Sequence, residues 1–196
     1  MDKNAPAFAY IHGFNSDKNS RSYQDVKALL GNVHDFYYNY RQEAKFAYQE
    51  IEEKLLSVYQ KNPHLTLIGS SLGGFFTLNF AGKYALPCVV FNPVTFPHEQ
   101  LAPFTGKNYN FYTHEEWDFT PELLLSYKEF PLSTKMKFTP TIVLGTNDEV
   151  ISPNVTLTFW KNKANILLTT NEHSINNYKD YVALFLRASK CNENCQ

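Results

Sequence analysis

The segment at residues 65–84 constrains the fold most strongly. It joins a short apolar run, LTLI, to a glycine-containing turn, GSSLGG, and then to an apolar helix-forming stretch. An apolar run without polar interruptions is typical of a strand buried on both faces, as in a parallel sheet. Similar short runs recur at residues 7–11, 88–91, 141–144 and 166–169. Amphipathic stretches separate these runs, which predicts an α/β fold with a mostly parallel sheet and helices on both faces.

Helical periodicity is clearest over residues 41–60, where apolar side chains recur at three- and four-residue steps. Shorter helices are predicted at residues 22–30 and 178–188, and an aromatic strand at residues 35–38. These elements fill the spaces between the apolar runs, so strands and helices alternate over most of the chain.

The chain has 196 residues, a length typical of one domain. Between Pro93 and Pro140 the alternation of strands and helices stops, and only one helix is predicted there, at residues 121–130. No repeat or flexible linker divides the sequence. We therefore expect a single domain over residues 1–196, in which residues 94–139 form a lid-like insertion over one edge of the sheet.

The overall charge and hydropathy exclude several classes of protein. The formal net charge is -1, whereas nucleic-acid-binding proteins usually carry a basic surface. No apolar run approaches the roughly 18 to 20 residues of a membrane span. The apolar stretch near the start is also too short for a signal peptide. We expect a cytoplasmic protein without a nucleic-acid partner or a membrane span, and the oligomeric state stays open.

The three cysteines do not suggest a disulfide framework. Cys88 lies in an apolar run and is predicted to be a small core residue, whereas Cys191 and Cys195 lie in a polar tail where pairing is open. The side chains of His114, Glu115, Glu116 and Asp118 are of types that bind metals. Their spacing fits no metal site on a helix face, however, and favours a solvated loop. No phosphate-binding loop or dinucleotide motif occurs, so we expect neither a metal nor a cofactor.

The turn at residues 69–73, GSSLG, fits the pattern G-x-S-x-G at a strand-to-helix junction. Such a turn holds a serine hydroxyl above the sheet and needs small flanking residues. The spacing from Gly69 and Gly73 selects Ser71 as the nucleophile and not Ser70. An ordinary glycine turn is the simpler interpretation, but the strand before and the helix after favour a nucleophile.

A serine nucleophile needs a histidine base, and in strand-turn-helix hydrolases the order along the chain is serine, acid, histidine. Of the six histidines, only His173 follows the last predicted strand and precedes the last helix. The acid should follow the preceding strand, where Asp148 lies in the sequence GTNDEV. An N-cap or turn role is the alternative for Asp148. The neighbouring Glu149 is expected to point elsewhere.

The sequence YIHGF at the end of the first strand supplies the fourth element of the predicted site. An oxyanion needs two N–H donors, which we expect to be the backbone amides of Phe14 and Leu72. Gly13 allows the backbone to turn, and His12 is predicted to hold the loop by hydrogen bonds. The simpler interpretation of His-Gly is a turn without catalytic function.

These motifs together resemble the YqiA/YcfP family of small bacterial α/β-hydrolase-fold esterases. The resemblance rests on YIHGFNS, LIGSSLGG, the FNP at residues 91–93, GTNDEV and His173, and so it covers nearly the whole chain. It implies a compact α/β-hydrolase fold with a small lid, and activity on short acyl esters or on acyl-CoA thioesters. By match it assigns the triad roles to Ser71, Asp148 and His173.

The function expected from the sequence is a serine esterase or thioesterase that hydrolyses small to medium acyl esters or acyl-CoA thioesters through an acyl-enzyme. A non-catalytic binding or regulatory module, or an acyltransferase or peptidase with the same triad, are the alternatives. Aromatic residues make up 16% of the chain, and many lie between Phe96 and Phe130. They either line an acyl pocket near Ser71 or simply pack on the sheet, and the sequence leaves both possibilities open.

Overall fold

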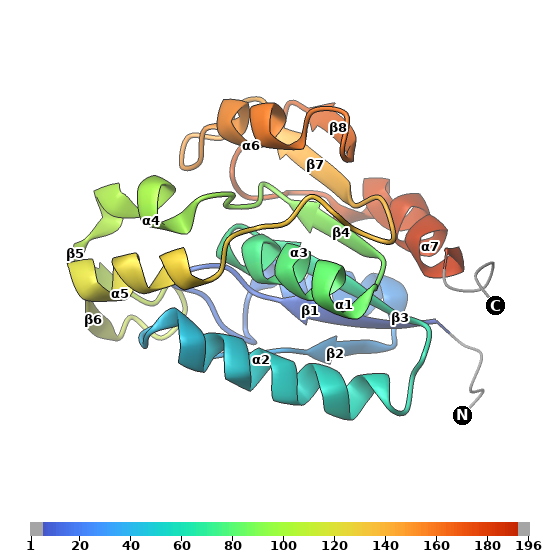
Figure 1. Cartoon of the computed structure of the whole chain (residues 1–196), viewed down its shortest axis with the longest axis horizontal. Helices are drawn as coiled ribbons and strands as arrows, with labels where there is room; N and C mark the ends of the chain where they lie inside the picture. The colour runs from blue at the N-terminus through green and yellow to red at the C-terminus, as the bar shows by residue number, and fades with distance from the viewer. Residues whose placement is uncertain (1–5, 192–196) are drawn as a thin grey trace.

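The computed structural model of the chain describes residues 6–191. Six strands form one sheet in the order β2-β1-β3-β4-β7-β8, and every neighbouring pair in it is parallel. Their bounds are Ala7–Ile11 (β1), Val33–Asp35 (β2), Leu65–Ser70 (β3), Cys88–Phe91 (β4), Thr141–Gly145 (β7) and Asn165–Thr169 (β8). Because the strands are parallel, all their carboxyl ends meet along one edge of the sheet (Figure 1).

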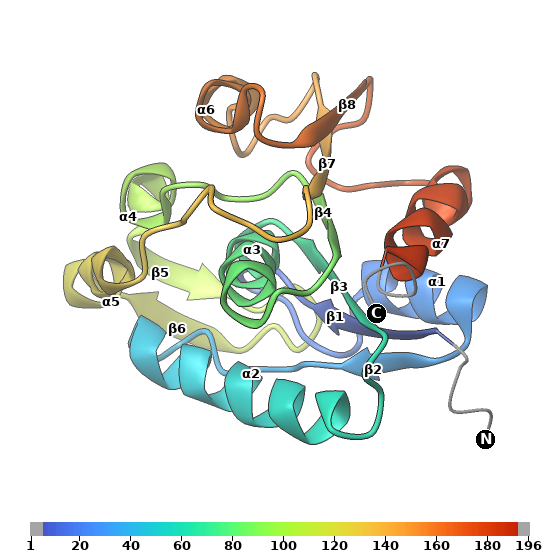
Figure 2. The same cartoon turned by 45° about the vertical axis from the view of Figure 1, so that its right-hand side comes forward.

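Helices cover both faces of the sheet (Figure 2). One face carries α2 (Ala44–Tyr59), α3 (Leu72–Tyr84) and α6 (Pro153–Trp160). The other carries α1 (Arg21–Leu30), the 3₁₀ turn η3 (Tyr178–Tyr181) and α7 (Val182–Lys190). The predicted α/β architecture, with a mostly parallel sheet covered on both faces, is therefore confirmed.

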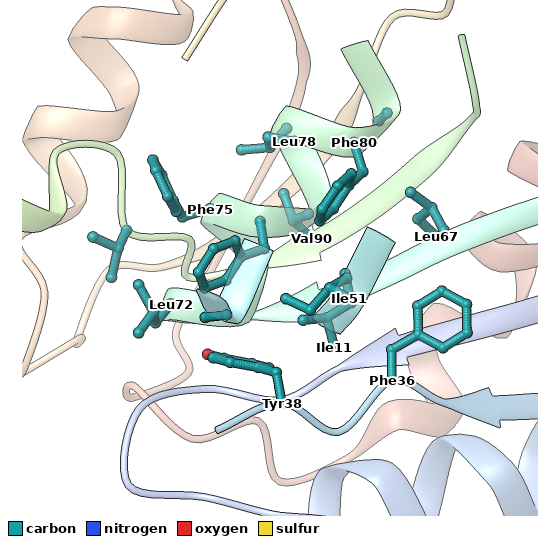
Figure 3. Close-up of a cluster of buried hydrophobic side chains, with 14 of the residues drawn as sticks. Ile11, Phe36, Tyr38, Ile51, Leu67, Leu72, Phe75, Leu78, Phe80 and Val90 are labelled. Carbon is teal, nitrogen blue, oxygen red and sulfur yellow. The ribbon is translucent and has the colours of Figure 1, made fainter. Parts of the chain in front are cut away.

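The larger core lies between the sheet and the helices α2 and α3, as Figure 3 shows. Ile11, Leu67 and Val90 project from three adjacent strands, and Ile51 and Phe80 meet them from the two helices. All five side chains are buried. Burying a side chain of this size contributes about 1.5–3 kcal/mol. This packing fixes α3, and with it the amino end of the helix at the carboxyl edge of the sheet.

Residues 94–139 lie between β4 and β7. The elements α4 to η2 gather beyond the carboxyl edge of the sheet, at the left in Figure 1, and the chain then runs back to the start of β7 at the other edge. The segment contains α4 (Pro97–Gln100), η1 (Ala102–Phe104), β5 (Gly106–Tyr109), β6 (Glu116–Phe119), α5 (Pro121–Ser126) and η2 (Tyr127–Glu129). The strands β5 and β6 form an antiparallel hairpin. The aromatic residues of the segment 94–139 are divided between core and surface, since Phe119 and Tyr127 are buried whereas Phe111 is 66% exposed.

The strand predicted at residues 35–38 is wrong, because β2 ends at Asp35. Phe36 and Tyr38 are buried, as a strand would require, but there the backbone leaves the sheet and passes His12. The N–H of Tyr38 donates to Nε2 of His12 at 3.4 Å, and the two rings stack. The N–H of Phe36 still donates to Tyr10 O of β1 at 3.0 Å, but the rings of Tyr37 and Tyr38 stack on His12, so the second half of the run reflects packing around His12 and not pairing within the sheet.

Two helices predicted as continuous each consist of an α-helix and an adjoining 3₁₀ turn. The prediction at residues 121–130 corresponds to α5 followed by η2, and the one at residues 178–188 to η3 followed by α7. The hairpin β5–β6 was not predicted, because β5 has no buried residue and its sequence, GKNY, carries no apolar alternation.

No helix within residues 6–191 is long and apolar enough to cross a membrane. Cys88 is buried in the core, as predicted. The possible pairing of Cys191 with Cys195 lies outside the described residues, since these stop at Cys191.

Candidate active site

Ser71 joins β3 to α3 with φ 54° and ψ -124°. This left-handed conformation costs a residue other than glycine on the order of 1–3 kcal/mol. Backbone hydrogen bonds hold the turn, because the N–H of Ser71 donates to Phe91 O at 3.0 Å and its carbonyl accepts from Gly74 N–H at 2.9 Å. The residue is only 9% exposed. The surrounding sheet and helix thus stabilise a strained turn that carries a hydroxyl group.

Two glycines in the turn are required by close backbone contacts. A Cβ on Gly69 would lie 2.6 Å from the carbonyl oxygen of Gly73. A Cβ on Gly73 would overlap the carbonyl oxygens of Ile11 and His12 at the end of β1. The amino end of α3 therefore lies directly against the end of β1, which a side chain at Gly73 would prevent, and against β3, which a side chain at Gly69 would prevent.

Asp148 follows β7 and His173 follows β8, so both reach the carboxyl edge that Ser71 occupies after β3. The two carboxylate oxygens lie 3.0 and 2.9 Å from Nδ1 of His173. The Asp148 side chain is 2% exposed and that of His173 is 17% exposed. The ionised carboxylate accepts a hydrogen bond from Nδ1–H, which leaves Nε2 as the nitrogen able to take a proton.

Two further side chains fix the loop that carries His173. Oε2 of Glu149 accepts a hydrogen bond from the backbone N–H of His173 at 3.0 Å, so the expectation that Glu149 points elsewhere is wrong. Asn92 donates through Nδ2 to the carbonyl oxygens of Glu172 and His173 at 3.0 and 2.8 Å. Its Oδ1 accepts from Gly145 N–H at 2.7 Å. Asn92 therefore connects the end of β7 to the loop after β8.

Asn92 is a residue that the sequence reasoning did not assign. It is 1% exposed and adopts φ 43°, a conformation that asparagine tolerates better than most residues. It directly follows Phe91, whose carbonyl binds the N–H of Ser71. One short segment after β4 therefore contacts both the serine turn and the histidine loop. The sequence FNP at residues 91–93 contains Asn92, but it was used above only as one of the motifs that support the family resemblance.

The loop after β1 lies against Ser71. A Cβ on Gly13 would lie 3.1 Å from Cβ and 3.7 Å from Oγ of Ser71. Within residues 6–191, the N–H groups of Phe14 and Leu72 donate to no other residue. These two unpaired amides flank the serine, Leu72 as its chain neighbour and Phe14 as the neighbour of Gly13. They are suitable donors for an oxyanion.

His12 lies beneath this loop and is 1% exposed. Its Nδ1 lies 2.9 Å from Gly13 O, and its Nε2 accepts from Tyr38 N–H. Both ring nitrogens are thus used within the fold by a neutral imidazole. Burial lowers the pKa of His12 to about 4, against the weaker opposing effect of the Gly13 hydrogen bond. These contacts hold the loop and leave His12 without a free nitrogen for acid–base work.

Asn15 ties the same loop to the hairpin of the insertion. Its Oδ1 accepts from Nε1 of Trp117 at 2.7 Å, and its Nδ2 donates to Oδ1 of Asn108 at 2.9 Å. Its carbonyl accepts from Phe111 N–H at 2.9 Å. Asn15 is 5% exposed, with φ 57°. The hairpin therefore positions the backbone next to Phe14, although nearly a hundred residues separate the two in sequence.

Two of the acidic residues that the sequence analysis considered as potential metal ligands form ion pairs with basic side chains. Glu115 forms an ion pair with Arg41 at 2.8 Å, and Glu116 pairs with Lys107 at 2.9 Å. Within the described part of the chain, no group of three or more histidine, cysteine or acidic side chains is arranged to hold a metal. Of the potential metal-ligand set, His114 and Glu115 therefore lie in the exposed turn of the hairpin, whereas Glu116 and Asp118 lie on the exposed face of β6, so the predicted loop covers only part of the set.

Several solved structures share this fold at low sequence identity. Est1E from Butyrivibrio proteoclasticus is 14% identical with a TM-score of 0.73, and the match covers 95% of this chain and 89% of that one. The esterase domain of a Rhodothermus marinus protein is 17% identical with a TM-score of 0.64, covering 96% and 88%. A structure reported for the metagenome-derived lipolytic enzymes LipS and LipT is 14% identical with a TM-score of 0.68, covering 96% and 94%. The chain thus has the α/β-hydrolase fold.

Membership of a sequence family follows from a separate comparison. The model of the Uncharacterised protein family (UPF0227) matches residues 7–187, which is most of the chain. The resemblance stated from the motifs concerned the same family, that of YqiA and YcfP. The chain therefore belongs to UPF0227.

Proposed function

We propose that the protein is a serine hydrolase that cleaves small acyl esters or thioesters through an acyl-enzyme. The observation that carries this proposal is the strained Ser71 turn at the same sheet edge as the hydrogen-bonded pair of Asp148 and His173. Strain of this kind persists only where the surroundings enforce it, and it concentrates at functional sites. The esterases among the structural neighbours are consistent with the proposal.

In the first half-reaction, Oγ of Ser71 attacks the acyl carbonyl carbon while Nε2 of His173 takes the hydroxyl proton. Asp148 holds the imidazole by its Nδ1–H and stabilises the imidazolium that forms. The carbonyl oxygen becomes an anion and accepts hydrogen bonds from the amides of Phe14 and Leu72. When the tetrahedral intermediate collapses, the bond to the leaving group breaks and His173 returns the proton to the departing oxygen or sulfur.

In the second half-reaction, water replaces the leaving group. His173 removes a proton from the water, which attacks the acyl carbon. When this second tetrahedral intermediate collapses, the bond from the acyl carbon to Oγ of Ser71 breaks, His173 returns the proton to Oγ, and the carboxylic acid leaves. No redox step and no bound cofactor enter this sequence. The base must be neutral for either step, because a protonated imidazole has no lone pair with which to accept a proton.

The test compares the wild type with Ser71→Ala in hydrolysis of p-nitrophenyl butyrate. The variant should lose the activity, and a fluorophosphonate probe should label the wild type at Ser71. Ser70→Ala is the matched control, since it removes the neighbouring hydroxyl and should keep both activity and labelling. Equal rates for the wild type and Ser71→Ala would refute the proposal. Assay of a short acyl-CoA beside the oxygen ester separates thioesterase from esterase activity.

A further inference from the structure

An apolar cavity of about 290 Å³ lies between α3, the insertion and α6. Most of its wall consists of aromatic or aliphatic side chains: Phe75, Phe96, Tyr127, Phe130, Leu132 and Phe159. The rings contact each other edge to face, with Phe96 and Phe159 centred 5.2 Å apart and Phe75 and Tyr127 6.0 Å apart. None of the residues that line it is Ser71, Asp148 or His173, so this cavity is distinct from the candidate catalytic groups.

The cavity nevertheless begins within one helical turn of the serine. The carbonyl oxygen of Ser71 accepts from Phe75 N–H at 3.3 Å and from Val94 N–H at 3.1 Å. Phe75 is part of the cavity wall, and so is Thr95, which follows Val94. Two segments that contribute to the cavity wall, α3 and the loop after β4, are therefore both hydrogen-bonded to the carbonyl oxygen of Ser71.

The hydroxyl and the N–H of Thr95, which lies at this end, are already paired within the protein. Oγ1 of Thr95 lies 2.9 Å from Oγ1 of Thr156, and the N–H of Thr95 donates to Oε1 of Gln100 at 2.7 Å. Burial raises the pKa of Tyr127, so its hydroxyl, which has no hydrogen-bond partner within residues 6–191, stays neutral. The only strong charge among the lining residues is the exposed Lys128. The interior is thus suited to hydrocarbon and not to a charged or strongly hydrated group.

We propose that this cavity is the acyl subsite, and that it receives the unbranched hydrocarbon chain of a medium-length acyl group whose carbonyl carbon Ser71 attacks. This inference rests on the proposed hydrolase function and specifies its substrate class. A volume of about 290 Å³ lies at the lower end of ligand pockets, which span about 300–1,000 Å³. A chain such as hexanoyl or octanoyl fits this space, whereas an acetyl group does not reach the aromatic wall.

The test fills the cavity and measures chain-length preference. Leu132→Trp adds bulk at a half-buried wall residue outside the helices and strands, and circular dichroism establishes that the variant is folded. Leu125→Trp is the matched control, because Leu125 is 51% exposed on α5 and does not line the cavity. The substrates are the p-nitrophenyl esters of acetate, butyrate, hexanoate and octanoate, with kcat/KM as the readout.

The wild type and Leu125→Trp should prefer hexanoate or octanoate over acetate. In Leu132→Trp, kcat/KM for octanoate should fall about ten-fold or more while the value for acetate stays close to that of the wild type. The inference is overturned if Leu132→Trp and Leu125→Trp give the same ratio of octanoate to acetate activity.

A binding measurement separates this inference from the hydrolase proposal. Sodium octanoate is titrated calorimetrically into Ser71→Ala and into the double variant Ser71→Ala/Leu132→Trp, neither of which depends on turnover. Binding to the first and loss of binding in the second supports the subsite. Equal binding to both overturns it, whatever the hydrolysis assay shows. Absence of Ser71-dependent hydrolysis refutes the proposed function by itself.

Discussion

The side-chain amide of Asn92 donates a hydrogen bond to the carbonyl oxygen of His173 at 2.8 Å. Because the same side chain also accepts from Gly145 N–H, the loop of the proposed base is anchored to the strand that precedes the proposed acid. The geometry of Asp148 and His173 thus depends on a neutral residue that takes no part in proton transfer. This relationship gives the first prediction.

Asn92→Ala should lower kcat for p-nitrophenyl butyrate and leave KM nearly unchanged, because the base loses its anchor while the substrate contacts remain. It leaves Gly145 N–H and two carbonyls without partners, so the free energy of unfolding should also fall by about 1–3 kcal/mol. Urea denaturation followed by circular dichroism measures the second effect.

Asn62→Ala is the control for that variant. It removes a similar amide-to-carbonyl hydrogen bond, to Val58 O at 3.0 Å, at the end of α2 and before β3. It should affect stability but not kcat. A kcat for Asn92→Ala equal to that of Asn62→Ala would contradict a positioning role for Asn92.

Asn15→Ala should reduce kcat by about ten-fold or more, because the backbone beside the Phe14 amide loses its side-chain hydrogen bonds to the hairpin. The loss of one oxyanion donor costs about 10²–10³-fold, which sets the upper limit. Steady-state hydrolysis of p-nitrophenyl acetate is the measurement, since a short substrate isolates the oxyanion contacts from the acyl chain.

Trp117→Phe provides an independent check on the same contact. It keeps a large aromatic side chain but removes the Nε1–H that donates to Asn15 at 2.7 Å. It should lower kcat in the same direction as Asn15→Ala, and the double variant should be little worse than the more affected single variant. Full additivity of the two effects would argue against a shared mechanism.

His12 should make the stability of the protein depend on pH. Burial lowers its pKa to about 4 in the folded state, from a value of 6.5 when solvated. Between these values the unfolded chain binds a proton that the folded chain does not, so stability decreases as pH falls from about 6.5 to about 4. The difference between the two pKa values corresponds to about 3 kcal/mol of folding stability. This contribution is fully present above the unfolded-state pKa and is lost as the pH falls to the folded-state pKa.

The measurement is urea denaturation at a series of pH values between 4 and 7 for the wild type and His12→Gln. Other groups titrate in this range in both proteins, so the difference between the two curves isolates the contribution of His12. The wild type should lose stability faster on acidification. Parallel curves for the two proteins would contradict the assignment.

Gly73→Ala should abolish activity and strongly destabilise the fold, since its Cβ would overlap the backbone oxygens of Ile11 and His12. Gly82→Ala is the control within the same helix. A Cβ there would meet only Cγ of Met136 at 4.0 Å. It should retain activity and gain about 0.5–1 kcal/mol from helix propensity. Thermal denaturation compares the melting temperatures of the two variants with that of the wild type. A Gly73→Ala variant as stable as the wild type would disprove the close approach of α3 to β1.

The inner strands of the main sheet were largely predictable because their apolar runs report burial on both faces, as at residues 65–68 and 88–91. The run at residues 166–169 does form a strand, β8, but burial on both faces is wrong for it, because β8 lies at the edge of the sheet and Leu167 and Leu168 are exposed. Aromatic residues 36–38 misled the prediction because burial outside the sheet leaves the same pattern as burial within it. The hairpin β5–β6 gave no signal, since most of its side chains are exposed and its stability comes from distant partners such as Asn15.

Spacing and chain order placed Ser71, Asp148 and His173 together as candidates, because these rules encode where strand ends meet. They contain no information on which neutral side chains hold the loops. Asn92 acts through backbone groups more than fifty residues away, and no local pattern marks such contacts. Glu149 was misassigned for the same reason, since its partner is the N–H of His173.

The parallel sheet also determines when the site is completed during synthesis. The strained serine turn needs β1, β3, β4 and α3, all of which leave the ribosome before β7 and β8. The proposed acid and base come from the ends of those last two strands. A nascent chain can therefore carry the proposed nucleophile without its proposed base, and the proposed triad is complete only when the last strand docks.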